Sequence, residues 1–251
     1  MKAPAVILLL ALASCSAFVI DPRIVNGTDA REGEFRYVVS LRNNLRHVCG
    51  GTILSDRFVL TAAHCVYDND RGQAANPALY SIQYGSVHIS QTEQRSVRVQ
   101  EIRLAPFNSA RLTYDVAVLK LVSPIPNNGL WEPVRLSRNF DTSSQHRGVI
   151  VGWGRLWQNG PIPSTLQKLD VQTYTNFVCG LRFDNTHHIC FGATIGGACN
   201  GDSGTALVVN GEQVGIASFI TSTCGVTSSL TPNVYARVPH YYDWIIRNSA
   251  N

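Results

Sequence analysis

The chain has 251 residues, 45% of them hydrophobic and 15% charged, a composition that favours a folded globular protein and excludes a disordered or fibrous one. Its length fits one large all-β domain or two small barrels that share a core. The net charge of +4 is small and the basic residues are scattered, which excludes a dense nucleic-acid-binding patch.

The N-terminus has the pattern of a secretory signal. Lys2 precedes an apolar run at 5–13, and small residues follow at 14–17. This order predicts cleavage after Ala17 and a secreted, extracellular product. The apolar run is much shorter than the roughly 20 residues that a membrane span needs. We therefore predict a signal peptide at 1–17 and no membrane anchor.

Short apolar or alternating stretches, separated by Gly, Pro, Asn and Ser, follow along the rest of the chain. This pattern favours an all-β sandwich or barrel. The breaker at 123–129 predicts a link between two halves. Only the tail, from Tyr241 to Asn248, has helical spacing, with Pro239 near its start. The clearest expected strands are 35–41, 80–84, 97–102, 116–121, 148–151, 166–172, 206–209 and 214–219.

Seven cysteines offer two interpretations. Cys15 leaves with the signal peptide, and the remaining six suffice for three disulfides in an oxidising compartment. Zinc is the alternative, but no Cys-x-x-Cys pair exists. The adjacent His187 and His188 would point to opposite faces of a strand and chelate poorly. We expect no metal.

Three local signals place a His, an Asp and a Ser in contexts that suit nucleophilic catalysis. His64 follows an apolar run, Asp115 opens another, and Ser203 lies in the turn Gly-Asp-Ser-Gly. Serine is a weak nucleophile until a neighbouring base takes its proton, and a neutral histidine can do so. A buried carboxylate fixes the imidazole tautomer, and glycines let backbone N–H groups face an oxyanion. Each signal alone is also typical of a structural histidine or a turn residue.

Together these signals and their neighbours resemble the trypsin/chymotrypsin family of serine proteases. The resemblance covers nearly the whole chain from Arg23, and it implies two antiparallel six-stranded β-barrels with a C-terminal helix. The barrels would span about 24–125 and 126–235, with the active site in the cleft between them. The matching motifs are Ile-Val-Asn-Gly at 24–27, Cys-Gly-Gly at 49–51, Thr-Ala-Ala-His-Cys at 61–65, Gly-Trp-Gly at 152–154, Gly-Asp-Ser-Gly at 201–204 and the segment 232–238.

The resemblance also implies functional roles. His64, Asp115 and Ser203 would form the catalytic triad of a serine endopeptidase, with the amides of Gly201 and Ser203 as the oxyanion hole. No cofactor is implied. The family's disulfide pairing closes short loops, each adding about 2–4 kcal/mol. These pairs would be Cys49–Cys65, Cys179–Cys190 and Cys199–Cys224.

By the same resemblance the chain is an inactive precursor with a propeptide at 18–23. Arg23 precedes Ile24, as in the family's activation sites. A trypsin-like protease would cleave there, and the freed Ile24 amine would pair with Asp202. Breaking such a buried pair costs about 3–5 kcal/mol, so forming it can order the oxyanion loop and the substrate pocket.

The substrate pocket would be formed by five residues: Gly197, Ser218, Phe219, Ile220 and Asn233. Gly197 at its base has no charge to hold Arg or Lys. Ile220 and Asn233 stand where relatives with large pockets have Gly. We therefore expect elastase-like cleavage after small or medium apolar residues; the alternative is chymotrypsin-like cleavage after Phe, Tyr or Leu. Thr205 also departs from the family, which usually has Gly there, and we expect it to alter packing only.

The sequence allows two alternative functions. One is a binding homologue that has lost catalysis, although such proteins typically lose a triad residue. The other is a cascade protease, which usually carries an N-terminal regulatory module. A digestive or venom enzyme fits the short segment 18–23 before Ile24 better, and we expect a digestive role. We expect a monomer that acts on proteins or peptides and binds protein protease inhibitors, but neither nucleic acid nor membranes.

Overall fold

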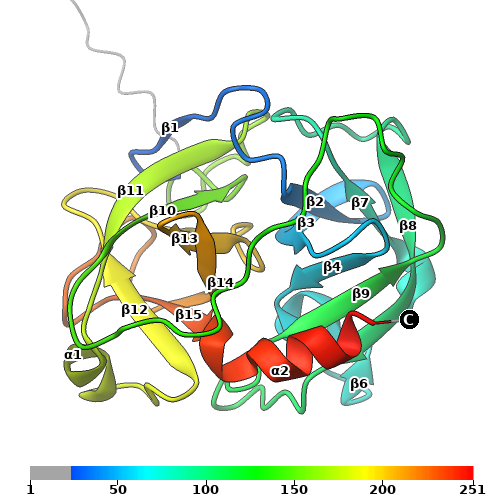
Figure 1. Cartoon of the computed structure of the whole chain (residues 1–251). Helices are drawn as coiled ribbons and strands as arrows, with labels where there is room; N and C mark the ends of the chain where they lie inside the picture. Colours follow the sequence, from blue (N-terminus) through cyan, green and yellow to red (C-terminus); the bar gives the residue numbers. More distant parts are fainter. Residues whose placement is uncertain (1–23, 251) are drawn as a thin grey trace, which may run out of the picture.

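Two closed antiparallel barrels of six strands each lie side by side, and a C-terminal helix runs beneath the first of them (Figure 1). This computed structural model describes residues 24–250. The predicted signal peptide at 1–17 and propeptide at 18–23 lie outside these residues. The expected all-β class with two six-stranded barrels and a C-terminal helix is confirmed.

The first barrel closes in the strand order β2-β3-β4-β9-β8-β7. Alternate side chains of its strands fill the interior, among them Leu41, Val59, Ile82 and Leu119. The sixth strand in this order closes the sheet on the first, so no edge is left unpaired. The strands are β2 (Val38–Asn43), β3 (Arg46–Ile53), β4 (Phe58–Thr61), β7 (Tyr80–Gln83), β8 (Ser96–Leu104) and β9 (Ala117–Leu121).

The second barrel has the order β11-β10-β13-β14-β15-β12 and closes through pairing of β12 with β11. Its strands are β10 (Arg147–Gly152), β11 (Gln167–Thr173), β12 (His188–Gly192), β13 (Ala206–Val209), β14 (Glu212–Ile220) and β15 (Asn233–Arg237).

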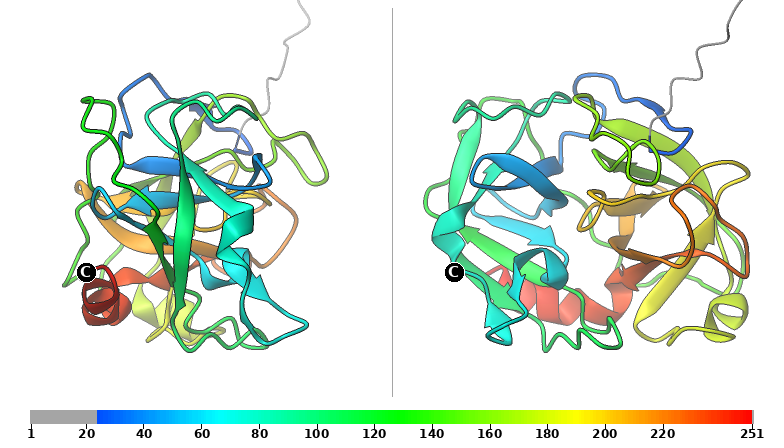
Figure 2. Two further views of the ribbon diagram at one scale, coloured as in Figure 1. Left: turned by 90° about the vertical axis from the view of Figure 1, so that its right-hand side faces the viewer. Right: turned by 180° about the vertical axis from the view of Figure 1, so that it is seen from behind.

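The N-terminal residues belong with the second barrel, although they were expected in the first. The short strand β1 (Thr28–Asp29) pairs with β11 at that barrel's edge (Figures 1 and 2). The side chain of Ile24 is fully buried in the second hydrophobic core, beside Ile189 and Phe191. Burial of this apolar side chain decides the placement, because sequence order alone would put it with β2.

Several short elements complete the chain. The helix α2 (Val238–Asn248) occupies the predicted tail. A helical turn, α1 (Asn176–Gly180), was not expected; its N-cap Thr175 accepts the Val178 N–H, and one turn is too short to show a period. The others are the hairpin β5 (Tyr67–Asp68) and β6 (Gln73–Ala74) and the 3-10 turns η1 (Ala63–Val66) and η2 (Pro77–Leu79).

The two barrels meet along an apolar seam that α2 covers. Phe58 and Val118 of the first barrel pack in one cluster with Ile216 of the second and with Tyr241 and Ile245 of α2. At the far end of the seam the backbones approach directly. The Gly50 N–H of β3 donates to the Ser203 carbonyl at 2.8 Å. This contact brings the turn with Ser203 against the first barrel.

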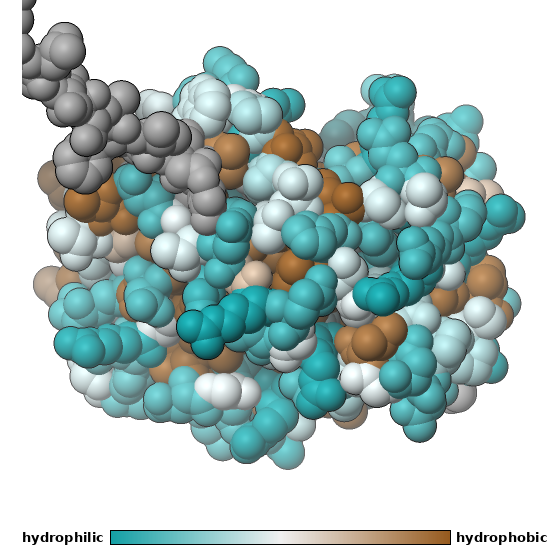
Figure 3. All heavy atoms as spheres, turned by 90° about the horizontal axis from the view of Figure 1, so that it is seen from above, coloured by the Kyte–Doolittle hydropathy of each residue, from teal (hydrophilic) through white to brown (hydrophobic). Residues whose placement is uncertain are grey.

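Polar residues predominate on the face seen from above, and apolar residues show there in small, separate groups (Figure 3). Within the part of the chain that the structure describes, no helix is both long and apolar enough to cross a membrane.

Replacing Gly50 with Ala should destabilise the seam, because the added Cβ would lie 2.1 Å from Thr205 Cγ2. Overpacking of this kind costs about 1–3 kcal/mol of unfolding free energy. The double variant Gly50→Ala/Thr205→Ser lacks that methyl group and should recover much of the loss. Urea unfolding of the two single variants and the double variant measures this coupling. A double variant no more stable than Gly50→Ala would contradict the contact.

Candidate active site

His64 and Asp115 form the best-defined contact of the site. His64 lies in η1, directly after β4, and Asp115 is fully buried before β9. The His64 Nδ1 lies 2.8 Å from Asp115 Oδ2, and the His64 backbone N–H donates to Oδ1 at 2.9 Å. Ser218 Oγ donates to Oδ2 at 2.5 Å. The carboxylate therefore fixes both the ring and the backbone of His64, with the Nδ1–H tautomer.

The segment before Asp115 has an unusual backbone that other elements hold. Leu112 and Tyr114 have φ of 52° and 56°, a left-handed conformation that is uncommon for bulky residues. The Tyr114 N–H donates to Tyr241 Oη of α2 at 2.9 Å. His188 of β12 donates through Nε2 to the Leu112 carbonyl at 3.0 Å. The second barrel and α2 thus help to place a carboxylate of the first barrel.

Ser203 lies in a tight turn that only small neighbours permit. Gly204 has φ +82°, and a Cβ there would lie 2.4 Å from the Gly50 carbonyl oxygen. Within residues 24–250 the Ser203 hydroxyl makes no hydrogen bond, to His64 or to any other group. Such bonds are often long before substrate binds. Ser203 lines a cavity whose lining residues all come from the second barrel and its loops.

The Gly201 and Ser203 amides are free donors with fixed directions. Neither N–H donates a hydrogen bond within the described residues. The carbonyl of Asn200, which shares a peptide unit with the Gly201 N–H, accepts the Arg155 N–H at 2.8 Å. The carbonyl and N–H of a trans peptide point in opposite directions, so anchoring the carbonyl sets the direction of the N–H. Free, oriented amides can stabilise an oxyanion.

His47 anchors the next peptide unit, a role that the sequence did not indicate. Its Nε2 lies 3.1 Å from the Gly201 carbonyl, which can only accept, so Nε2 carries the proton. Ser40 Oγ then donates to Nδ1 at 2.8 Å. Burial lowers the pKa of His47 to about 4, although its bond to Gly201 opposes this. His47 is therefore neutral at physiological pH.

The Asp202 carboxylate is buried without a cation among residues 24–250. It accepts the Gly154 N–H at 2.7 Å and the Cys199 N–H at 2.9 Å. Burial raises the pKa of Asp202 to about 7, and the two N–H bonds only partly oppose it. A charged Asp202 is therefore costly unless a cation joins it.

The cavity beside Ser203 is small, about 40 Å³. The predicted pocket residues Ser218, Phe219 and Ile220 line it; Gly197 and Asn233 do not. Asn233 Oδ1 instead accepts the Ala198 N–H at 2.8 Å and would lie 2.8 Å from a Cβ on Gly197. Asn233 therefore lies behind the lining. Sequence reasoning missed several lining residues: Ala198, Cys199, Asn200, Ala217 and Tyr235.

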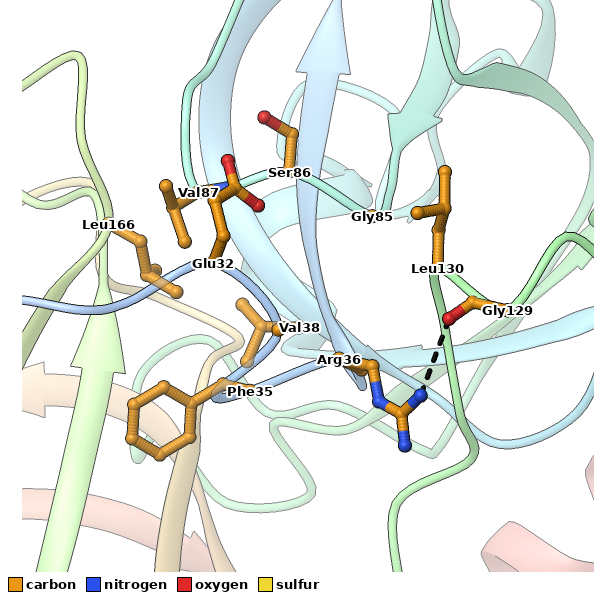
Figure 4. Close-up of a pocket in the computed structure, with 11 residues that line it drawn as sticks. Glu32, Phe35, Arg36, Val38, Gly85, Ser86, Val87, Gly129, Leu130 and Leu166 are labelled. Atoms are coloured by element: carbon orange, nitrogen blue, oxygen red, sulfur yellow. Dashed lines mark hydrogen bonds between the residues drawn. The ribbon is translucent and has the colours of Figure 1, made fainter.

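A second cavity, of about 160 Å³, lies between the segment that leads into β2 and the loops that carry Val87 and Leu130 (Figure 4). The segment 32–38 lines it together with Val87, Leu130 and Leu166. Arg36 at its edge donates to the Gly129 carbonyl at 3.3 Å and pairs with Glu132. Its lining contains no residue of the predicted catalytic set.

The structure contains the three disulfides Cys49–Cys65, Cys179–Cys190 and Cys199–Cys224. The first joins β3 to η1 and so holds His64 near Gly50. One group of three potential metal ligands occurs among the described residues: Cys49, His64 and Cys65. Both cysteines are bonded to each other, so this group does not fit a metal ion.

Comparison with known proteins agrees with this geometry. The sequence profile of the family described as Trypsin matches residues 24–245. The chain belongs to the trypsin family. Chymotrypsin-2 of Vespa crabro is 37% identical over 90% of this chain and 99% of its own length, and serine protease SP24D of Anopheles gambiae is 36% identical over 91% and 82%. The chain is accordingly a serine endopeptidase, a hydrolase of the chymotrypsin-like type.

Solved structures give the same fold. Neuropsin from mouse brain superimposes with a TM-score of 0.77 at 26% identity, over 90% of this chain and 99% of that one. Human heparin binding protein gives 0.77 at 26% identity, over 90% and 97%. The first is described as a serine protease and the second as a heparin binding protein, so the shared fold does not by itself define an activity.

In the pH profile of kcat/KM, the midpoint of the rise on the acid side should lie above pH 6.5. Burial alone would lower the pKa of His64, but the hydrogen bond and the charge of Asp115 outweigh it and raise the pKa above 6.5. A base must be neutral to accept a proton, so kcat/KM should rise as pH passes this raised pKa. Asp115→Asn removes the charge and should move the midpoint to lower pH, with a rate lower by several powers of ten. A midpoint below 6.5 in the unmodified enzyme would contradict the contact.

Proposed function

We propose that this protease acts through His64, Asp115 and Ser203 and is secreted as a zymogen, with digestion as its role. The observation that carries the proposal is the His64–Asp115 contact together with a serine turn whose Gly201 and Ser203 N–H groups have no acceptor among residues 24–250. An active enzyme needs all three parts together: a base, a nucleophile and an oxyanion site.

The reaction divides among these groups. His64 Nε2 takes the Ser203 proton as Oγ attacks the peptide carbonyl, and Asp115 stabilises the imidazolium at Nδ1. The attacked carbonyl oxygen becomes an oxyanion, which accepts hydrogen bonds from the Gly201 and Ser203 N–H groups. His64 then returns the proton to the leaving amine nitrogen as the C–N bond breaks, and the acyl group stays on Ser203 Oγ as an ester. A water molecule next attacks this ester while His64 takes a proton from the water. The bond to Ser203 Oγ breaks as His64 returns the proton to Oγ, and the carboxylic acid product leaves. Every step uses groups within residues 24–250.

Two partners follow from the activation model. A trypsin-like protease would cut after Arg23, and the new Ile24 ammonium would neutralise Asp202. The Ile24 side chain is already packed in the second core, and Val25 accepts the Gly197 N–H at 3.2 Å through its carbonyl. The buried Asp202 carboxylate, which has no cation beside it among residues 24–250, supports this pairing. Protein inhibitors that mimic a substrate are further expected partners, and the enzyme would be an extracellular monomer.

Titration of the active site tests activation and catalysis together. After trypsin treatment, an organophosphorus serine reagent should label one Ser203 per chain. Arg23→Gln should remain uncleaved and largely unlabelled, and Ser203→Ala should be cleaved but inert, with a rate lower by several powers of ten. Stoichiometric binding of the reagent to Ser203→Ala, or full activity of uncleaved Arg23→Gln, would refute the respective assignment. No labelling of the cleaved enzyme would favour the non-catalytic binding homologue.

The primary specificity is proposed to be elastase-like. The cavity beside Ser203 has room for about three waters, comparable to a small aliphatic side chain. Ile220 lines it. Gly197, which the family resemblance places at the pocket base but which does not line this cavity, has no negative charge to hold Arg or Lys. The chymotrypsin-like alternative requires the Ile220 side chain to move aside. The name of the relative Chymotrypsin-2 favours this alternative.

Tetrapeptide substrates that end in Ala, Leu, Phe or Arg separate these cases. We expect kcat/KM for Ala or Leu to exceed that for Phe and Arg. Ile220→Gly should enlarge the pocket and raise the Phe/Ala ratio at least 10-fold, because a filled apolar pocket discriminates by roughly 1–3 kcal/mol. Preference for Phe in the unmodified enzyme would overturn the small pocket, and preference for Arg would overturn the whole pocket assignment.

A further inference from the structure

Thr205 is fully buried three residues beyond Asp202, directly behind the serine turn. Its Oγ1 donates to the Asp202 carbonyl at 2.6 Å, and its backbone N–H donates to the same oxygen at 3.0 Å. One carbonyl therefore accepts two hydrogen bonds from one residue. The sequence predicted only altered packing at Thr205; the structure adds two hydrogen bonds to the backbone beside Ser203.

The carbonyl that Thr205 binds belongs to the peptide unit that carries the Ser203 N–H. This N–H points away from the carbonyl and, among residues 24–250, donates to nothing. Anchoring the carbonyl at two donors restricts rotation of the whole peptide plane. Hydrogen bonds at a carbonyl also polarise the amide and strengthen its N–H as a donor. Both effects act on the atom that the proposed mechanism aims at the oxyanion.

We propose that the Thr205 hydroxyl is a positioning group for the oxyanion hole, acting through the Asp202–Ser203 peptide. The proposal rests on the catalytic role of Ser203 proposed above. Thr205 itself touches neither substrate nor the reacting atoms. Its contribution should appear where charge develops on the substrate oxygen and should be absent from ground-state binding.

The other contacts of Thr205 keep its hydroxyl in place. Its carbonyl accepts the Ala217 N–H at 2.8 Å, and its methyl group packs on Gly50 of the first barrel. Both rotation about Cα–Cβ and movement of the backbone are thereby limited. The hydroxyl is held by the second barrel through Ala217 and by the seam through Gly50.

The test compares hydroxyl with methyl in the cleaved enzyme, at concentrations set by titration of the active site. Thr205→Val keeps the shape and loses the O–H, while the Thr205 N–H bond to Asp202 remains. We expect kcat to fall about 3- to 10-fold, the effect of one neutral hydrogen bond, with KM within about twofold. Affinity for a peptidyl trifluoromethyl ketone, which forms an oxyanion in the hole, should fall by the same factor.

Two controls separate positioning from stability. Thr205→Ser keeps the hydroxyl and should retain kcat within about twofold, although it loses the methyl contact with Gly50. Thr52→Val makes the same chemical change at a buried threonine whose Oγ1 donates to Gln213 at 2.8 Å, and it should leave kcat unchanged. If Thr205→Val does not fold, Thr205→Ser and Thr205→Ala give the same comparison, since they differ only in the hydroxyl.

Three results would overturn the proposal: an unchanged kcat in Thr205→Val, a loss in Thr205→Ser equal to that in Thr205→Val, or a loss confined to KM. Failure of the proposed function is a separate outcome, because the unmodified enzyme would then not be titrated by the serine reagent. With an active parent enzyme, the variants report on Thr205 alone.

Discussion

The site depends on a close backbone contact between the two barrels. His64 and Asp115 come from the first barrel and Ser203 from the second, so the proposed proton transfer between Ser203 and His64 requires that the barrels keep one relative position. The Gly50–Ser203 hydrogen bond and the missing side chain at Gly204 set that position at the cleft. Side chains larger than hydrogen at Gly50 or Gly204 would separate the two halves of the site.

The buried carboxylates of Asp115 and Asp202 differ in the partners that surround their charge. Asp115 has His64 and the Ser218 hydroxyl beside it, and its charge raises the pKa of His64. Asp202 has only backbone N–H groups within residues 24–250, and its own pKa is raised to about 7. The first carboxylate is thus paired with the proposed base, His64. The second is proposed to be paired only after cleavage, which separates folding of the chain from full assembly of the site.

Sequence patterns predicted the parts of this protein that depend on local periodicity and on residue type. The stretch 80–84 alternates apolar and polar residues and contains β7, whereas β3 contains Gly50 and Gly51 and shows no such pattern. Those glycines have no β propensity of their own. Gly50 is required by the close approach of Thr205, which is distant in sequence, and Gly51 by the close approach of Leu60 in the neighbouring strand β4. Tertiary contacts of this kind also place Ile24 in the second barrel and Asn233 behind the pocket lining, where residue order gives no indication.

The proposed oxyanion hole shows why a backbone function is hard to predict from sequence. Three successive carbonyls, of Asn200, Gly201 and Asp202, are each anchored, by the Arg155 N–H, His47 Nε2 and Thr205 respectively. None of these three partners has a catalytic motif, and their side chains differ in chemistry. What they share is a donor directed at a carbonyl, which fixes the following N–H. The constraint acts on the direction of a peptide plane, so different residues can satisfy it, and a threonine can stand where relatives usually have glycine.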